Sequence, residues 1–248
     1  METEEPDPTA NCHPEEESPV LQPPPVPVIE PTFSGVIDGL LKRPVLLLAR
    51  VQSSNSAAML KRMLVLAALC MGAFGLILGW VSGGQQFWLA PLKIVAGIAL
   101  CGLITLPSLY IFSCLNGHEI SLKAVAGVLV SSLALTGLLL MGLAPVLWVF
   151  VQSSESLPFL GFLGLAFWSI ALAFGLSLVF RTSAAKEAGR SPFLAIWVAI
   201  FVLVALQMST SLRPLIGTAD TILPKEKKFF LTHWFDEFSR ASGKTRWK

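Results

Sequence analysis

The chain has 248 residues, of which 54% are apolar and only 14% are charged, and its mean hydropathy is +0.68. Soluble domains carry about 25% charged residues, so this composition excludes a soluble globular protein and indicates a multi-pass membrane protein. A net charge of only +2 argues against nucleic acid as a partner, and four cysteines are too few for a disulfide-stabilised scaffold.

The first 31 residues are acidic and rich in proline. Residues 1–41 contain nine acidic residues and no Lys or Arg, and residues 1–31 hold nine of the 17 prolines. A segment with one sign of charge and few apolar side chains buries too little surface to offset the entropy lost on ordering. We therefore expect 1–31 to be a disordered tail, with a polyproline II bias over 22–31. Its role stays open between a docking segment for a partner and a solvated spacer.

Residues 32–62 are predicted to form an amphipathic juxtamembrane segment. One helical face is marked by apolar residues at i, i+3, i+4, i+7 and i+8, namely Phe33, Val36, Ile37, Leu40 and Leu41. Pro44 disfavours helical geometry at the residue before it, so the helix is expected to break at Lys42-Arg43. A second short apolar turn follows over 45–51. Lys61 and Arg62 then mark the membrane edge as candidate contacts of lipid headgroups.

Five apolar runs without Asp, Glu, Lys, Arg or His meet the criterion for membrane-crossing helices: 64–81, 94–115, 124–151, 158–180 and 193–212. About 20 apolar residues cross a hydrocarbon core roughly 30 Å thick. Each charged residue at a helix centre costs about 2.5–3.5 kcal/mol on insertion, so runs without charge are favoured as spans. Lys93 is accordingly placed in the connection before the second run. The short connections predict an all-α transmembrane bundle over 63–212, whose five helices pack antiparallel in sequence order.

Small residues recur inside the predicted spans at intervals that let helices approach closely. Gly75, Gly79 and Gly83 lie four residues apart, and Ser132 and Thr136 repeat this spacing in the third run. The pattern favours packing between helices of one chain, and a seam between two copies is the alternative.

The C-terminal segment, 213–248, combines basic and aromatic residues, which is typical of a helix that lies in the membrane interface. A helix packed on the surface of the bundle is the alternative. Candidate headgroup contacts in this segment are Arg213, Lys227, Lys228 and Trp234. With a cytoplasmic N-terminus, both sides carry nine basic residues, but seven against five lie within about 20 residues of a span end, which favours this orientation.

Chemistry-bearing residues are sparse. The three His lie at 13, 118 and 233, outside the apolar runs, and the four Cys lack the spacing of metal ligands. The sequence also has neither a phosphate-binding Gly-Lys loop nor a dinucleotide-binding fingerprint. We therefore expect a non-enzymatic protein with no catalytic residues, no cofactor and no metal site.

The second run holds the best polar constellation. It is a candidate polar groove or partner site made of Thr105, Pro107, Ser108, Tyr110, Ser113 and Asn116. Pro107 frees a backbone carbonyl inside the helix, which neighbouring hydroxyls can bond, and Tyr110 is suited to the headgroup level. A kinked packing helix followed by a tight loop is the favoured interpretation, and the groove or partner site is the alternative.

Three features resemble bacterial members of the Yip family. These are Lys42-Arg43-Pro44 ahead of five spans, Leu106-Pro107-Ser108-Leu109-Tyr110 followed by an Asn116-Gly117 loop, and a Pro-rich tail. The resemblance covers roughly 33–212 and is mostly one of topology. Eukaryotic members are five-span proteins that interact with Rab GTPases and shape transport membranes. Because the acidic-aromatic-Gly-Pro signature of that branch is missing here, the resemblance implies the fold rather than GTPase binding.

Taken together, the sequence predicts an integral protein of the bacterial inner membrane that acts as an interaction or membrane-organising component, alone or as a subunit of a larger complex. Its expected partners are the lipid bilayer and other membrane proteins. The alternative is a small transporter or channel subunit. Such a protein would have to line its path with Thr105, Ser108, Ser113, Ser131, Ser132 and Thr136.

Overall fold

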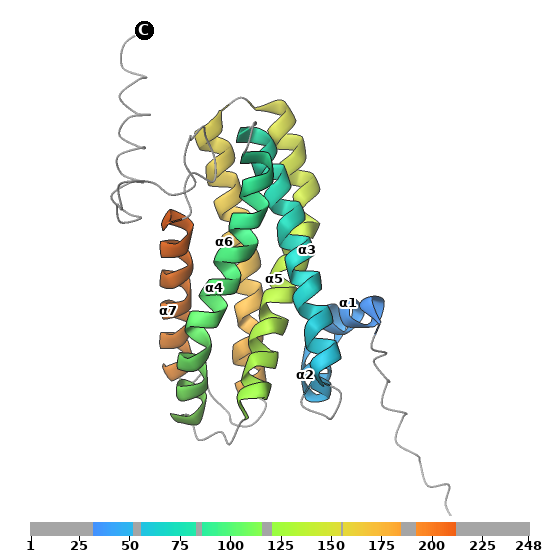
Figure 1. Cartoon of the computed structure of the whole chain (residues 1–248), viewed down its shortest axis with the longest axis vertical. Helices are drawn as coiled ribbons and strands as arrows, with labels where there is room; N and C mark the ends of the chain where they lie inside the picture. The colour runs from blue at the N-terminus through green and yellow to red at the C-terminus, as the bar shows by residue number, and fades with distance from the viewer. Residues whose placement is uncertain are drawn as a thin grey trace, which may run out of the picture.

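The computed structural model describes residues 32–51, 56–82, 86–115, 121–154, 156–184 and 192–211. Within these ranges the prediction of an all-α bundle is confirmed, and Figure 1 shows the helices side by side along one long axis. The predicted tail 1–31, the segment 213–248 and Asn116 lie outside the described residues.

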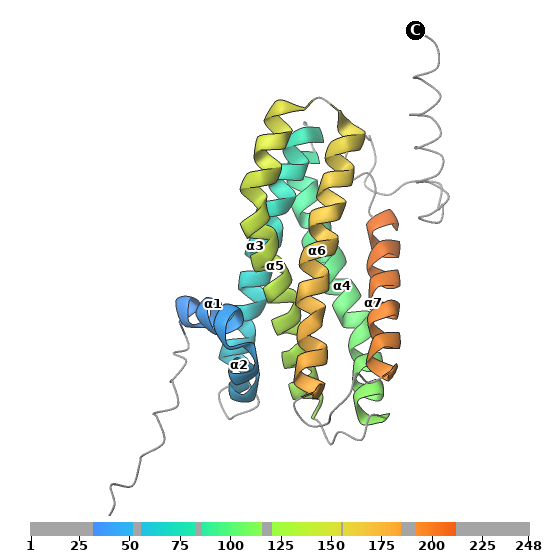
Figure 2. The same ribbon diagram turned by 180° about the vertical axis from the view of Figure 1, so that it is seen from behind.

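Two short helices, α1 (Phe33–Lys42) and α2 (Pro44–Val51), precede the long ones. The Thr32 side chain caps α1 by accepting a hydrogen bond from the Gly35 N–H at 3.2 Å. The predicted break falls at Arg43, whose φ of −142° and ψ of 59° are not helical. Pro44 opens α2, since a residue at the first helical position needs no N–H. In Figures 1 and 2, α1 runs across the long axis of the bundle.

Five long apolar helices follow: α3 (Ser56–Ser82), α4 (Gln86–Leu115), α5 (Leu122–Ser153), α6 (Leu157–Ala184) and α7 (Pro192–Ser211). The helices α3 to α6 are each long and apolar enough to cross a membrane, and α7 adds a shorter apolar stretch, Pro192–Met208. This is the architecture of a multi-pass integral membrane protein. The fifth predicted run is thus helical, although its apolar part is shorter than in the other four helices.

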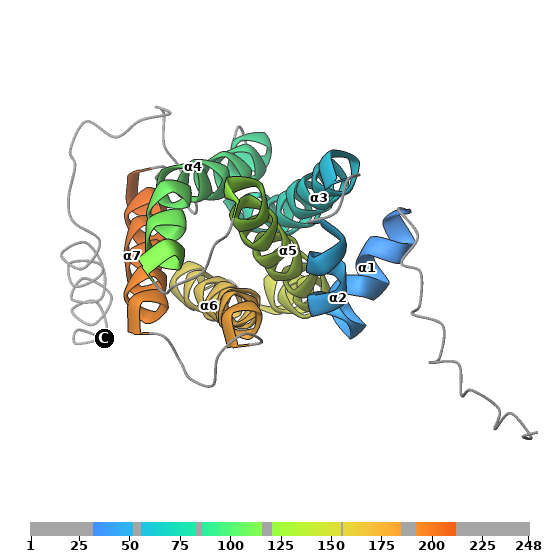
Figure 3. The same ribbon diagram turned by 90° about the horizontal axis from the view of Figure 1, so that it is seen from below.

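The long helices alternate in direction, but neighbours in space are not always neighbours in sequence. α3 and α5 run parallel in close contact, where Ser131 Oγ lies 3.3 Å from Met63 Sδ. α7 packs mainly against α4 instead of α6, and α5 occupies the centre of the bundle (Figure 3). The expected packing in sequence order holds for α3–α4 and α5–α6 but is wrong for α4–α5 and α6–α7, because short connections set the direction of each helix but not its neighbour.

Two apolar clusters stabilise the fold. The larger lies among α3 to α7 and includes Trp197 and Phe201, both fully buried. The smaller packs Val36 of α1 and Leu47 of α2 against Met63 of α3 and against α5. The amphipathic pair α1–α2 is therefore docked on the bundle by a core of its own.

Glycines lie where two helices approach most closely. A Cβ at Gly75 of α3 would lie 2.7 Å from Pro91 Cα of α4. A Cβ at Gly175 of α6 would overlap the Thr136 hydroxyl of α5. Both contacts join helices of this chain, so Gly75 and Gly175 allow close packing within the bundle. Gly79 is also buried, and Gly83 lies outside the described residues.

Candidate functional site

Thr105, one of the residues predicted to line a groove in α4, instead joins α4 to α7. Thr105 is 1% exposed, and its hydroxyl donates to the Cys101 carbonyl at 2.8 Å. The Thr105 carbonyl in turn accepts hydrogen bonds from Ser108 Oγ at 2.8 Å and from Trp197 Nε1 at 3.1 Å. This carbonyl is thus the centre of a contact between two helices, in line with the favoured interpretation of a packing helix.

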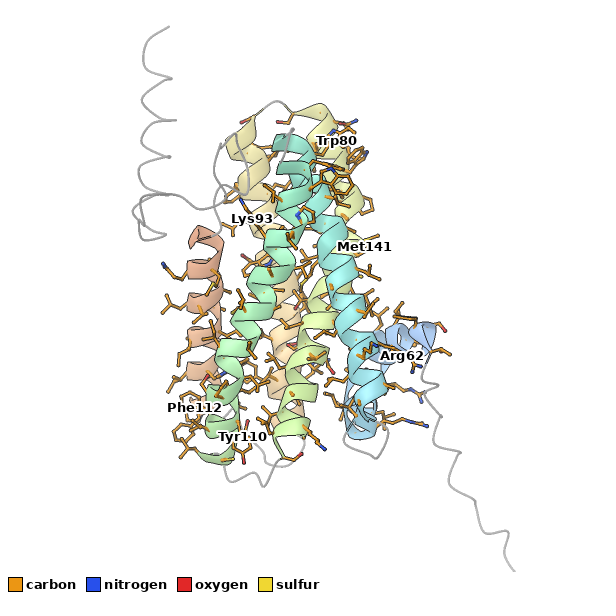
Figure 4. The ribbon with its side chains drawn as sticks, in the orientation of Figure 1. Arg62, Trp80, Lys93, Tyr110, Phe112 and Met141 are labelled. Carbon is orange, nitrogen blue, oxygen red and sulfur yellow. The ribbon has the colours of Figure 1, made fainter. Side chains whose placement is uncertain are left out.

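The other members of the predicted groove do not converge on Thr105. Pro107 and Tyr110 lie on the outer surface of α4, and Ser113 is half-buried one turn further on. Tyr110 lies near the end of α4 at the bottom of Figure 4. The described residues therefore do not assemble the predicted groove.

The hydroxyls of α5 that a transport path would need are also engaged in packing. Ser131, Ser132 and Thr136 are all fully buried. Ser131 donates to the Gly127 carbonyl at 2.7 Å, and Thr136 donates to the Ser132 carbonyl at 2.9 Å. Ser132 donates across to the Gly175 carbonyl of α6. Each hydroxyl is therefore satisfied by a backbone carbonyl, as expected for polar groups in lipid.

Lys93 is a buried charge inside a membrane helix, and the sequence-based prediction of its position was wrong. Because α4 begins at Gln86 and not near 94, Lys93 belongs to this helix and is 5% exposed (Figure 4). The antiparallel contacts Trp197–Thr105 and Phe201–Cys101 set the register of α7 on α4. Extended toward the start of α4, this register places Lys93 level with the last turn of α7. The terminal carbonyls of a helix carry partial negative charge. The apolar residues 87–92 were the signal for the longer helix.

Cations gather at the end of the bundle where α3 and α5 begin, which we call the basic end. Seven of the eight Lys and Arg residues described by the structure lie there: Lys42, Arg43, Arg50, Lys61, Arg62, Lys123 and Arg181. Asp38 is the one acidic residue within the described ranges, and its carboxylate pairs with Lys42 at 2.6 Å. The basic end therefore carries a large excess of positive charge.

Aromatic rings mark the opposite end. Trp80 of α3 makes edge-to-face contacts with Phe87 of α4 and with Trp148 of α5, at centroid distances of 5.9 and 5.5 Å. Indole rings of this kind are enriched at membrane interfaces. From Arg62 to Trp80 the helix rises about 27 Å at 1.5 Å per residue, close to the roughly 30 Å of a hydrocarbon core. These two residues, labelled in Figure 4, therefore bracket an apolar belt of membrane thickness.

The two predicted headgroup contacts in α3 have different surroundings. Lys61 is exposed, whereas Arg62 is half-buried beside α1 (Figure 4). Arg62 Nη1 is buried and meets no hydrogen-bond partner within the part of the chain that the structure describes. The other predicted contacts, Arg213, Lys227, Lys228 and Trp234, lie outside that part.

Comparisons with protein-family models, with curated proteins and with solved structures found no match to this chain.

Proposed function

We propose that this protein is a non-enzymatic membrane-organising component that holds the amphipathic pair α1–α2 in one leaflet at the basic end. The observation that carries the proposal is the way α1 is docked. Val36 and Leu40 are buried against the bundle at 0% and 1% exposure, whereas Phe33 and Leu41 remain 49% and 55% exposed. The apolar face of α1 is thus wider than the surface that the bundle covers.

The helix α1 has three faces with different surroundings. The first packs on α3 and α5, the second is apolar and exposed, and the third carries Ser34 and the Asp38–Lys42 pair. A helix with an apolar and a charged exposed face lies in the membrane interface, with its axis along the membrane plane. The axis of α1 runs across the bundle, which is the direction this placement requires (Figure 1).

Docking gives this interfacial helix a fixed depth. A free amphipathic helix binds and leaves the interface reversibly, because its affinity depends only on its own apolar area and charge. Here the core formed with Met63 of α3 and Ala134 of α5 holds α1 beside the spans. The protein therefore occupies more area in one leaflet than in the other at that level, and such asymmetry favours curved membranes.

We further propose that the membrane is the bacterial cytoplasmic membrane and that the basic end faces the cytoplasm. The positive-inside rule supports this orientation, since seven Lys and Arg residues within about 20 residues of a span end fall on the side of the basic end and five on the other side. The acidic tail 1–31 would then extend from α1 into the cytoplasm, where it is available to protein partners. The resemblance to five-span Yip proteins belongs to the same proposal and rests on the order of the elements.

A transporter or channel subunit is the less favoured function. Its path would need polar side chains that face a passing solute. The buried hydroxyls of Thr105, Ser132 and Thr136 instead donate to backbone carbonyls at helix contacts. These bonds support a packed interior in the described part of the bundle.

Membrane tubes pulled from giant vesicles test the proposed function. The full chain is labelled and reconstituted, and its density on the tube is divided by its density on the vesicle. We expect enrichment on tubes for the wild type, and loss of that enrichment for the double variant Phe33→Gln/Leu41→Gln. Ser34→Gln on the polar face is the matched control and should keep the enrichment. A double variant that is enriched as strongly as the control would contradict the proposal.

A further inference from the structure

We infer that Arg62 anchors the phosphate of one anionic phospholipid in a site on α3 beside α1. The inference deepens the proposed function by naming the lipid that the basic end selects. It rests on that proposal only for the level of α1 at the membrane surface.

The position of Arg62 on α3 places it at the edge of the face that α1–α2 covers. Met59, Met63 and Leu66 form that face, and all three are buried in the smaller apolar cluster. Arg62 precedes Leu66 by four residues and follows Met59 by three, so it lies beside this face along one row of the helix. The Nη1 atom of its guanidinium is buried, and Figure 4 shows Arg62 near α1.

The unpaired Nη1 atom of Arg62 calls for an anionic acceptor. A buried donor without a partner is costly, and a guanidinium keeps its charge under all physiological conditions. Within the described ranges the only carboxylate is that of Asp38, which pairs with Lys42. The phosphodiester of a lipid offers two oxygens to the planar fork of an arginine, a geometry that gives strong charge-assisted hydrogen bonds.

The surface above Arg62 fits an acyl chain. Residues three, seven, eleven, fourteen and eighteen positions after Arg62 lie on the same side of α3, and they are Val65, Leu69, Ala73, Leu76 and Trp80. All are apolar, and Leu69 is 65% exposed. A phospholipid whose phosphate binds Arg62 can therefore place its acyl chains along this row of apolar residues, which runs toward the middle of the membrane.

A general attraction between the basic end and an anionic surface would not single out Arg62. Lys61 is the neighbouring cation, is exposed, and lies on another side of α3. In a diffuse interaction each cation contributes alike and modestly. A built site instead depends on the enclosed arginine, so the two residues form a matched pair for the test.

The experiment measures lipid retention by the full chain in detergent. Purified protein is incubated with equal amounts of phosphatidylglycerol and phosphatidylcholine that carry identical acyl chains, and bound lipid is counted by native mass spectrometry. We expect the wild type to retain one phosphatidylglycerol in preference to phosphatidylcholine. Arg62→Gln should lower this retention roughly tenfold or more, as expected for loss of a charged hydrogen bond. Lys61→Gln, which removes the same charge, should lower it less than about fivefold.

Two further measurements keep the test independent of folding and of the proposed function. Phosphatidylglycerol should raise the unfolding temperature of the wild type and of Lys61→Gln, but not that of Arg62→Gln. Arg62→Lys, which keeps the charge without the fork, should fall between the wild type and Arg62→Gln in retention.

Equal losses in Arg62→Gln and Lys61→Gln, or selective retention by Arg62→Gln, would overturn the inference. So would an Arg62→Gln variant that is destabilised to the same extent with and without phosphatidylglycerol, because Arg62 would then act within the protein. Tube enrichment of Arg62→Gln reports on the proposed function separately. Lipid retention that depends on Arg62 in a wild type that shows no enrichment on tubes would support the site and contradict the curvature role.

Discussion

Replacing Gly175 by Ala probes a tight contact between α5 and α6. The added Cβ would overlap the Thr136 hydroxyl of α5 and lie 2.7 Å from the Ser132 carbonyl oxygen. One of these neighbours is a backbone atom inside a helix and has no flexible side chain to move. The substitution therefore forces α5 and α6 apart, and it weakens the hydrogen bond from Ser132 to the Gly175 carbonyl.

The expected loss of stability follows from three terms. Forcing an extra methyl group into a packed contact costs about 1–3 kcal/mol. Loss of the interhelical hydrogen bond costs about 0.6 kcal/mol in a membrane protein. Replacing Gly by Ala in a helix returns up to about 1 kcal/mol of helix propensity. The last two terms nearly cancel, so Gly175→Ala should lower the free energy of unfolding by about 1–3 kcal/mol.

Reversible unfolding in mixed detergent micelles, followed by circular dichroism, measures this difference. Gly142→Ala on α5 is the control, since a Cβ there meets nothing within 4 Å and the variant should be as stable as the wild type or slightly more stable. The double variant Thr136→Ala/Gly175→Ala should recover part of the loss, because the hydroxyl is gone while the Ser132 carbonyl remains. If Gly175→Ala is as stable as Gly142→Ala, the tight crossing of α5 and α6 is wrong.

Two further predictions concern α7 and the topology. Trp197→Phe keeps an aromatic ring but removes the donor to the Thr105 carbonyl, so unfolding in the same micelles should require about 0.6–1.7 kcal/mol less; unchanged stability would mean that this bond does not hold α7 on α4. In a chain whose native cysteines are replaced, single cysteines at 5 and 244 should be labelled from opposite sides of the membrane. Labelling of both from the same side would contradict five crossings.

Local properties of the chain account for what sequence reasoning predicted correctly. Hydropathy depends on the residues of one segment, so the apolar runs identify the long helices α3 to α7 before any packing is known. Pro44 acts on its immediate neighbours, which is why the break between α1 and α2 is also readable. The clustering of cations near the starts of α3 and α5 can also be predicted from the sequence, because the positions of Lys and Arg are known and successive helices alternate in direction.

The neighbour of each helix was decided only by the tertiary structure. Short connections impose an up-and-down path, yet α7 packs on α4 and α5 packs parallel to α3 because their surfaces match there. For the same reason the sequence favoured a packing helix at Thr105 without identifying the helix it packs against. The Thr105 carbonyl meets Trp197, 92 residues away, and no local pattern encodes such a distant donor.

The enclosed guanidinium of Arg62 shows the same division. Lys61-Arg62 marks the membrane edge in the sequence alone, because two adjacent cations precede a long apolar run. Which of the two is partly enclosed depends on the side of α3 that α1 covers, and this follows from how Val36 and Leu40 fit against Met63. Local composition thus decides which residues form the membrane helices. A site, in contrast, arises where surfaces from distant segments fit together in space.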